Sequence, residues 1–154
     1  MNSSEKIKQL AYERLAEAKI LCNAGKYNGA FYLAGYSVEL MLKAKVCQHF
    51  KIDNLFDKNG CNIQGISDLR KVVETHDINL LLIFSGLEGE FRKAKGDNEI
   101  LRDSYLFFTA CTGNKIDWNE QVRYLSEPKA KEIVERFIVL LNDSNGILKW
   151  IENN

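Results

Sequence analysis

The segment that most constrains the fold is residues 27–50, which is apolar around most of its circumference when wound as a helix. Its apolar side chains are Ala30, Phe31, Leu33, Ala34, Val38, Leu40, Met41, Leu42, Ala44, Val46 and Cys47. A helix with so little polar surface must be covered on nearly every side by other elements. The sequence therefore predicts a central, buried helix that is surrounded by other helices.

The remaining apolar positions also recur at helical rather than strand spacing. Residues 4–23 predict an amphipathic helix, and Gly25 provides the stop before an antiparallel partner over residues 27–50. Shorter apolar runs predict helices over residues 68–74, 78–84 and 98–111, and a last helix from Pro128 through residue 141 with a weaker extension to 151. We therefore expect residues 1–154 to form a single all-α domain, an up-and-down bundle of four or five helices.

Three stretches lack an apolar helical pattern. Residues 51–67 contain several Asn and Gly positions and predict a long loop, with a functional role or a role as a packing lid. Residues 89–97 are charged and are expected to be exposed, and residues 118–125 are expected to be extended or irregular.

Composition excludes several classes of function. The 21 Lys and Arg residues balance 21 Asp and Glu residues, so the chain lacks the overall positive field of a protein that coats nucleic acid. The four cysteines form no CxxC pair and only two histidines are present, so we expect no zinc site, no other metal and no cofactor. The N-terminal residues do not resemble a signal peptide, and no apolar run approaches the roughly 18 residues of a membrane span, so we expect a cytoplasmic protein.

Three motifs resemble the HEPN family of helical domains. Residues 24–44, AGKYNGAFYLAGYSVELMLKA, resemble the family's first helical hairpin together with the helix before them. The matching positions are Arg14, Leu15, Glu17, Ala18, Leu21, Gly25, Tyr27, Ala30, Tyr32, Leu33, Ala34, Gly35, Tyr36, Glu39, Leu42, Lys43 and Ala44. The segments THDINLL (residues 75–81) and WNEQVRY (residues 118–124) are similar to further family segments.

The resemblance implies a HEPN-like bundle that works as a homodimer. Family members accompany nucleotidyltransferases or belong to toxin–antitoxin and defence systems, and many are metal-independent endoribonucleases with an Arg-x(4–6)-His motif at the dimer interface. It thus implies a nucleotidyltransferase or an antitoxin as a partner.

Arg70 and His76 have the spacing of that ribonuclease motif, with five residues between them. An imidazole can carry the proton of the 2′-hydroxyl, and a guanidinium can stabilise the charge on the phosphorus. However, Lys71 follows Arg70 where the family usually carries Asn, Asp or His, and the pair precedes the third main helix instead of opening a late one. We favour a structural interpretation, in which His76 lies at a helix cap between Thr75 and Asp77.

A narrow polar stripe along residues 27–50 offers a second candidate site. Glu39 and Lys43 stand four residues apart on it, beside Tyr32 and Tyr36. A buried charge must be paired, so we favour an ion-pair network to which Arg123 could add a further charge. The functional alternative is a pocket for a nucleotide, in which the tyrosine rings stack on a base.

Three functional hypotheses follow. The leading one is a dimeric accessory module without enzymatic activity, with Phe137 and Trp150 near the C-terminal end as a candidate interface. The alternatives are a metal-independent endoribonuclease that uses Arg70 and His76, and a nucleotide-binding module.

Overall fold

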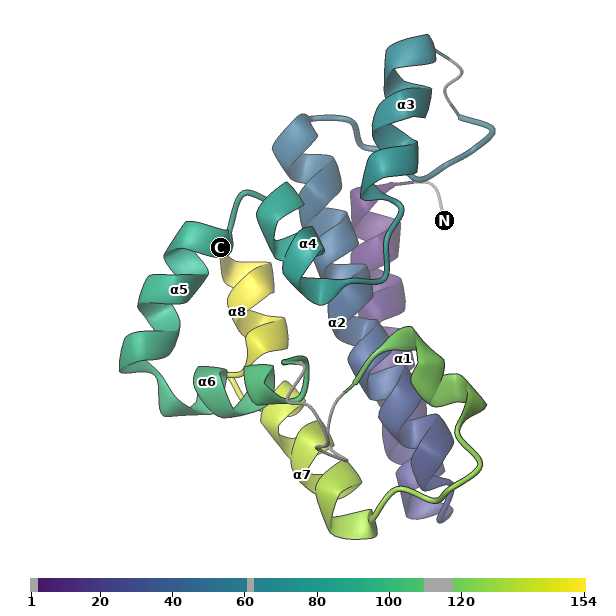
Figure 1. The fold of residues 1–154 in the computed structure, drawn as a ribbon, viewed down its shortest axis with the longest axis vertical. Coiled ribbons are helices and arrows are strands. Elements are labelled where there is room, and N and C mark those ends of the chain that lie inside the picture. Colours follow the sequence, from purple (N-terminus) through teal and green to yellow (C-terminus); the bar gives the residue numbers. More distant parts are fainter. Residues whose placement is uncertain (1–2, 61–62, 110–117) are drawn as a thin grey trace.

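The helix α2 (Tyr27–Phe50) lies at the centre of the computed structural model, which describes residues 3–60, 63–109 and 118–154. It packs against α1, α4, α7, α8 and the 3₁₀-helix η1 (Figure 1). Buried residues occur on every side of α2, including the polar side chains of Ser37, Glu39 and Lys43. The predicted central helix is therefore confirmed, with the bounds that the sequence indicated.

The helix α1 (Ser4–Asn23) packs along α2 as the predicted hairpin (Figure 1). Its first turn is capped by the Ser3 hydroxyl, which accepts a hydrogen bond from the Lys6 amide at 3.2 Å. Gly25 ends the helix with a φ of +76°, a conformation that favours glycine. The Lys26 amide then donates to the Leu21 carbonyl, which closes the turn into α2.

Four shorter helices follow α2: α3 (Gln64–Val73), α4 (Ile78–Phe84), α5 (Glu88–Asp97) and α6 (Glu99–Leu106). Of these, α4 packs on α2, whereas α5 packs on α4 and α6, and α6 also packs on α7 and α8. The bounds of α4 agree with the prediction. The predicted loop over residues 51–67 was too long, because α3 begins at Gln64 and places Ile66 and Leu69 against the core.

The charged stretch 89–97 is largely exposed, as predicted, and it lies within the helix α5. The helix itself was not predicted, because Phe91 is its one buried side chain and no apolar stripe marks it. An ion pair at helical spacing, Arg92 Nη2 to Glu88 Oε1 at 2.6 Å, supports the helix instead. The helix α6 is shorter than the predicted 98–111, and residues 110–111 lie outside the described residues.

The C-terminal part consists of η1 (Glu120–Tyr124), α7 (Lys131–Asn142) and α8 (Ile147–Asn153). The segment 118–125 was predicted as irregular, and the structure adds one 3₁₀ turn to it. The last helix was predicted to start at Pro128 and to continue weakly to 151. It starts at Lys131 instead, and α8 is a separate helix.

Gly146 explains the break between α7 and α8. A Cβ atom at this position would lie 2.0 Å from the Leu140 carbonyl oxygen, so only glycine allows the chain to turn so tightly. The turn lets α8 pack beside α2 and α6.

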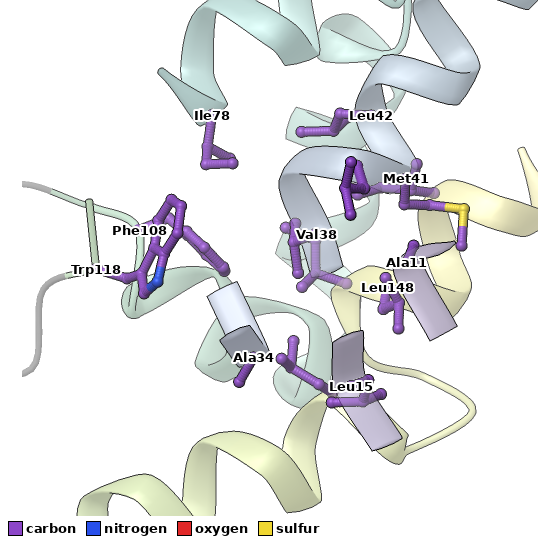
Figure 2. Close-up of a cluster of buried hydrophobic side chains, with 14 of the residues drawn as sticks. Ala11, Leu15, Ala34, Val38, Met41, Leu42, Ile78, Phe108, Trp118 and Leu148 are labelled. Atoms are coloured by element: carbon purple, nitrogen blue, oxygen red, sulfur yellow. The ribbon is translucent and has the colours of Figure 1, made fainter. Parts of the chain in front are cut away.

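The core forms where α1, α2 and α8 meet and continues to Trp118 and Phe108 (Figure 2). Ala11 of α1 and Leu148 of α8 lie close to Met41 of α2 (Figure 2). The fold is therefore an all-helical bundle, with no strand among the described residues. In the same part of the chain, no helix combines the length and the apolar character needed to cross a membrane.

Candidate functional site

His76 lies between α3 and α4, where the backbone is fixed by the cap of α4. Asp77 Oδ1 accepts hydrogen bonds from the amides of Asn79 and Leu80 at 2.8 and 3.2 Å. The Thr75 hydroxyl accepts from the Asp77 amide at 3.1 Å. The predicted cap is thus confirmed at Asp77, and it holds the preceding His76 ring next to α2.

The imidazole of His76 is bound to a buried carboxylate. His76 Nδ1 lies 2.9 Å from Glu39 Oε1, and Glu39 is only 1% exposed. The ring itself is 49% exposed on its other side. A carboxylate at Nδ1 fixes the orientation of the ring and leaves Nε2 as the outward nitrogen. Among the described residues, Nε2 has no hydrogen-bond partner.

Lys43 neutralises the buried Glu39. Lys43 Nζ donates to the same Oε1 atom at 2.7 Å, and its ammonium group lies 5.7 Å from the centre of the Phe56 ring. Glu39 therefore has two partners from two elements, as a buried carboxylate requires. The expected ion pair at positions 39 and 43 forms, and His76 is a member of this network that the sequence did not reveal.

A cavity of about 510 Å³ opens beside the imidazole. The described residues that line it are Glu74, Thr75, His76, Asp77, Ile78, Asn79, Phe108, Trp118, Asn119 and Glu120. Three of them carry carboxylates, and none of them is Lys or Arg. Glu74 is partly neutralised by Lys58, whose Nζ lies 3.4 Å away and outside this lining.

Arg70 does not join His76 in this cavity. Its guanidinium is buried at the end of α3, where Nε donates to the Leu55 carbonyl at 2.5 Å. Because α3 ends at Val73 and the chain then turns, Arg70 and His76 lie on different elements of local structure. Arg70 is absent from the described lining of the cavity. The spacing in the sequence thus does not bring the two side chains together at one site within this chain.

The tyrosines of the polar stripe stack on each other. The rings of Tyr32 and Tyr36 lie 5.9 Å apart at an angle of 9°, and the Trp118 ring stacks on Tyr32 at 6.4 Å. Burial raises the pKa of Tyr36, and the nearby Glu39 raises it further. Neither tyrosine belongs to the described lining of the cavity beside His76, and the nucleotide pocket at Tyr32 and Tyr36 stays a prediction.

Arg123 was expected to join the network of Glu39 and Lys43. The structure gives it other neighbours. Hydrogen bonding to Tyr32 raises the pKa of Arg123, and its guanidinium lies 4.8 Å from the centre of the Tyr124 ring. Arg123 therefore links η1 to α2 through its interaction with Tyr32.

Trp118 and Gly35 form a contact that the sequence did not indicate. A Cβ atom at Gly35 would lie 2.2 Å from the indole, and the indole Nε1 donates to the Tyr32 carbonyl at 3.0 Å. The indole is only 4% exposed, so Trp118 is a core residue. A glycine among large residues of a buried helix is the signal that could have pointed to this close approach.

The described residues contain no cluster of His, Cys, Asp and Glu that could hold a metal ion. Comparison of the chain with protein-family models, with curated proteins and with solved structures finds no match. Function must therefore be argued from the site itself.

Proposed function

We propose that this chain is a HEPN-like helical accessory module that binds a partner and does not cleave RNA. The observation that carries the proposal is the charge of the cavity at His76. Its described lining contains Glu74, Asp77 and Glu120 and no cationic side chain. A nuclease must attract and stabilise a phosphate, which needs the opposite charge.

Simple electrostatics gives the size of this effect. Two like charges about 4 Å apart repel by about 1 kcal/mol in water and by about 4 kcal/mol near a protein surface. The carboxylates of Asp77 and Glu120 therefore disfavour a phosphodiester in this cavity, by an amount that solvent and salt reduce for exposed groups. The guanidinium of Arg70 does not offset this, because it bonds to the Leu55 carbonyl inside the fold.

The resemblance of residues 24–44 to the HEPN hairpin supports a homodimer that works with a nucleotidyltransferase or an antitoxin. The two aromatic residues first considered for the interface already have partners within one chain. Phe137 is fully buried, and Trp150 packs edge-to-face on Phe91 at 5.2 Å. Exposed apolar side chains such as Val139 on α7 are better placed for a dimer contact.

A cytoplasmic location is part of the same proposal. Cys22 and Cys47 are free thiols inside the core, and burial raises the pKa of Cys47 to about 11. Thiols kept in this protonated form act as small apolar side chains, which suits a reducing compartment.

One observation favours the endoribonuclease as a second candidate. Glu39 orients His76 and leaves Nε2 facing outward, which is how a carboxylate prepares an imidazole for proton transfer. In that case His76 would be the acid–base group and Arg70 would need to be replaced by a cation from elsewhere, such as a second protomer.

RNA cleavage by the purified protein in the presence of EDTA separates the two candidates. We expect no cleavage by the wild type, and the same result for His76→Ala and Arg70→Ala. Cleavage by the wild type that His76→Ala abolishes would overturn the proposal. The matched control is His49→Gln, since His49 lies in the last turn of α2 and is absent from the described lining of the cavity, so its loss must not affect a genuine activity.

A further inference from the structure

We infer that Asn59 is a site of spontaneous covalent modification, at which the backbone nitrogen of Gly60 attacks the side-chain amide and water completes the deamidation. This inference goes beyond the proposed function and does not depend on it. The chain contains three Asn-Gly pairs, at residues 28–29, 59–60 and 145–146. The sequence alone makes each pair a candidate, whereas the structure distinguishes one of them from the other two.

The reaction requires the side-chain amide of asparagine and the next backbone nitrogen to meet. This nitrogen loses its proton and forms a bond to the side-chain Cγ atom, while the bond from Cγ to the side-chain nitrogen breaks and that nitrogen leaves as ammonia. Water then opens the resulting succinimide ring to aspartate or isoaspartate. Glycine favours the attack because it has no Cβ to obstruct it and its backbone adapts most easily. An exposed glycine amide and an unrestrained asparagine side chain are therefore the structural conditions for deamidation.

The pair at residues 28–29 does not meet these conditions. It lies in the first turn of α2, and the Asn28 side chain is held at both of its polar atoms. Oδ1 accepts from the Lys129 amide at 2.7 Å, and Nδ2 donates to the Glu127 carbonyl at 3.0 Å. Attack by the Gly29 nitrogen would require both bonds to break and the helix to open at this turn.

The pair at residues 145–146 is protected by its backbone. Gly146 is buried, and its amide donates to the Asp143 carbonyl at 3.0 Å. The Asn145 amide is held by Asp143 Oδ1 at 2.8 Å, and the Asn145 carbonyl accepts from Asn98 Nδ2 at 3.3 Å. The tight turn at Gly146 therefore keeps the nucleophilic nitrogen away from water and away from the side chain that it would attack.

The pair at residues 59–60 meets both conditions. Asn59 and Gly60 are exposed, in the turn that follows Asp57. The Asn59 side chain has no hydrogen bond within the part of the chain that the structure describes. The Gly60 amide has one bond, to the Asp57 carbonyl at 3.2 Å. A single bond in an exposed turn opens at little cost, so the nitrogen becomes available for the attack.

The modification changes the charge of the molecule. It replaces a neutral amide next to Lys58 by a carboxylate. Because the formal net charge of the unmodified chain is zero, the modified chain is a net anion at neutral pH and separates from the unmodified chain by ion exchange. The isoaspartate product also lengthens the backbone of the turn by a methylene group.

The test incubates the full chain at mildly alkaline pH and locates deamidation by peptide mass spectrometry, with digestion at mildly acidic pH to prevent further reaction. In the native protein we expect Asn59 to convert at least roughly tenfold faster than Asn28 and Asn145, because the latter must first break hydrogen bonds within the fold. In guanidinium chloride, which removes this protection, we expect the three pairs to convert at similar rates.

Two variants assign the charged form that ion exchange detects. We expect Asn59→Gln to suppress its formation, because the longer side chain cannot form the five-membered ring. Asn145→Gln is the matched control, since it makes the same change in another exposed Asn-Gly pair and should leave the rate unchanged.

Two results would overturn the inference. One is equal conversion of the three pairs in the native protein, or conversion of Asn59 only in guanidinium chloride. The other is a charged form that appears as fast in Asn59→Gln as in the wild type.

Discussion

At the scale of single residues, the site depends on one carboxylate in the centre of the protein. Glu39 is almost fully buried in α2, and its Oε1 atom is shared by Lys43 and His76. A charge in this position is tolerated only because both partners compensate for its loss of water. The same three side chains therefore determine stability and the orientation of the imidazole.

Removing one member of the buried pair should be costly. We expect Glu39→Leu to lower the free energy of unfolding by about 3–5 kcal/mol, because it leaves the Lys43 charge buried without its partner. The double variant Glu39→Leu with Lys43→Met should recover most of this loss. Urea unfolding of the four proteins measures both effects, and a double variant as unstable as the sum of the two single ones would contradict the account.

The hydrogen bonds of Asp53 make the stability of the protein depend on pH in a direction that can be stated in advance. Its Oδ1 atom accepts hydrogen bonds from the amide and the hydroxyl of Ser4, and these bonds lower the pKa of Asp53. A lowered pKa contributes stability that is present above the usual value near 4 and is lost as the pH falls through the folded value. We therefore expect Asp53→Asn to destabilise the protein at about pH 6 and much less at about pH 3.

Urea midpoints at the two pH values measure this difference, and Ser4→Ala serves as the matched variant, since it removes the hydroxyl from the same contact. A destabilisation by Asp53→Asn that is equal at both pH values would show that the charge of the carboxylate is not involved.

At the scale of elements, η1 and the residues after it are held against α2 by contacts that the spacing of apolar residues does not predict. The Trp118 indole lies against Gly35 at one end of this segment. At the other end, the Asn28 side chain bonds to the backbone of Leu125, Glu127 and Lys129. These contacts bring Trp118, Asn119 and Glu120 to the cavity beside His76.

A methyl group at Gly35 should disturb this contact. We expect Gly35→Ala to lower stability by about 1–3 kcal/mol, because its Cβ would overlap the Trp118 ring. Gly89→Ala is the control, since a Cβ there meets nothing within 4 Å in a helix that alanine favours, and it should be neutral or stabilising. Thermal unfolding compares the two, and equal effects of both substitutions would argue against the packing of Trp118 on Gly35.

Asn28 offers a test of how the segment after η1 is held. Its Oδ1 accepts from the Lys129 amide at 2.7 Å, and its Nδ2 donates to the Glu127 carbonyl at 3.0 Å. We expect Asn28→Ala to speed hydrogen exchange at Lys129 at least tenfold, the factor for about 1.4 kcal/mol of lost protection. Asn28→Asp keeps an oxygen acceptor at this position and should retain much of the protection of the Lys129 amide. Unchanged exchange in Asn28→Ala would mean that other contacts hold the segment.

The helices that carry a wide apolar face could be predicted from the sequence, whereas those held by other means could not. The spacing of apolar residues located α1, α2 and α4 to the residue. The helix α5 was missed because an ion pair and one phenylalanine hold it. The separation of α7 from α8 depends on a steric limit at Gly146, which a pattern of hydrophobicity does not record.

The candidate site was predicted only in part. The pairing of Glu39 with Lys43 follows from their spacing on one helix. The contact of Glu39 with His76 joins residues 37 positions apart and requires knowledge of how α4 packs on α2. Arg70 had a suitable spacing in the sequence, but the end of α3 between the two residues directs its side chain to Leu55.

At the scale of the whole molecule, the net charge is zero, but charges of the two signs are not evenly mixed over the protein. The central helix carries one compensated ion pair, and the described lining of the cavity at its surface is acidic. Such a molecule has no general attraction for nucleic acid, so any RNA must bind through a local feature. We therefore expect no phosphate to bind next to the His76 ring.

The measurement that tests this claim most directly is an NMR titration of the His76 ring with short single-stranded RNA. We expect RNA to leave the His76 signal unchanged, with His49 as the internal reference. A saturable shift of the His76 signal by RNA, with His49 unchanged, would contradict the proposed function and would favour the endoribonuclease.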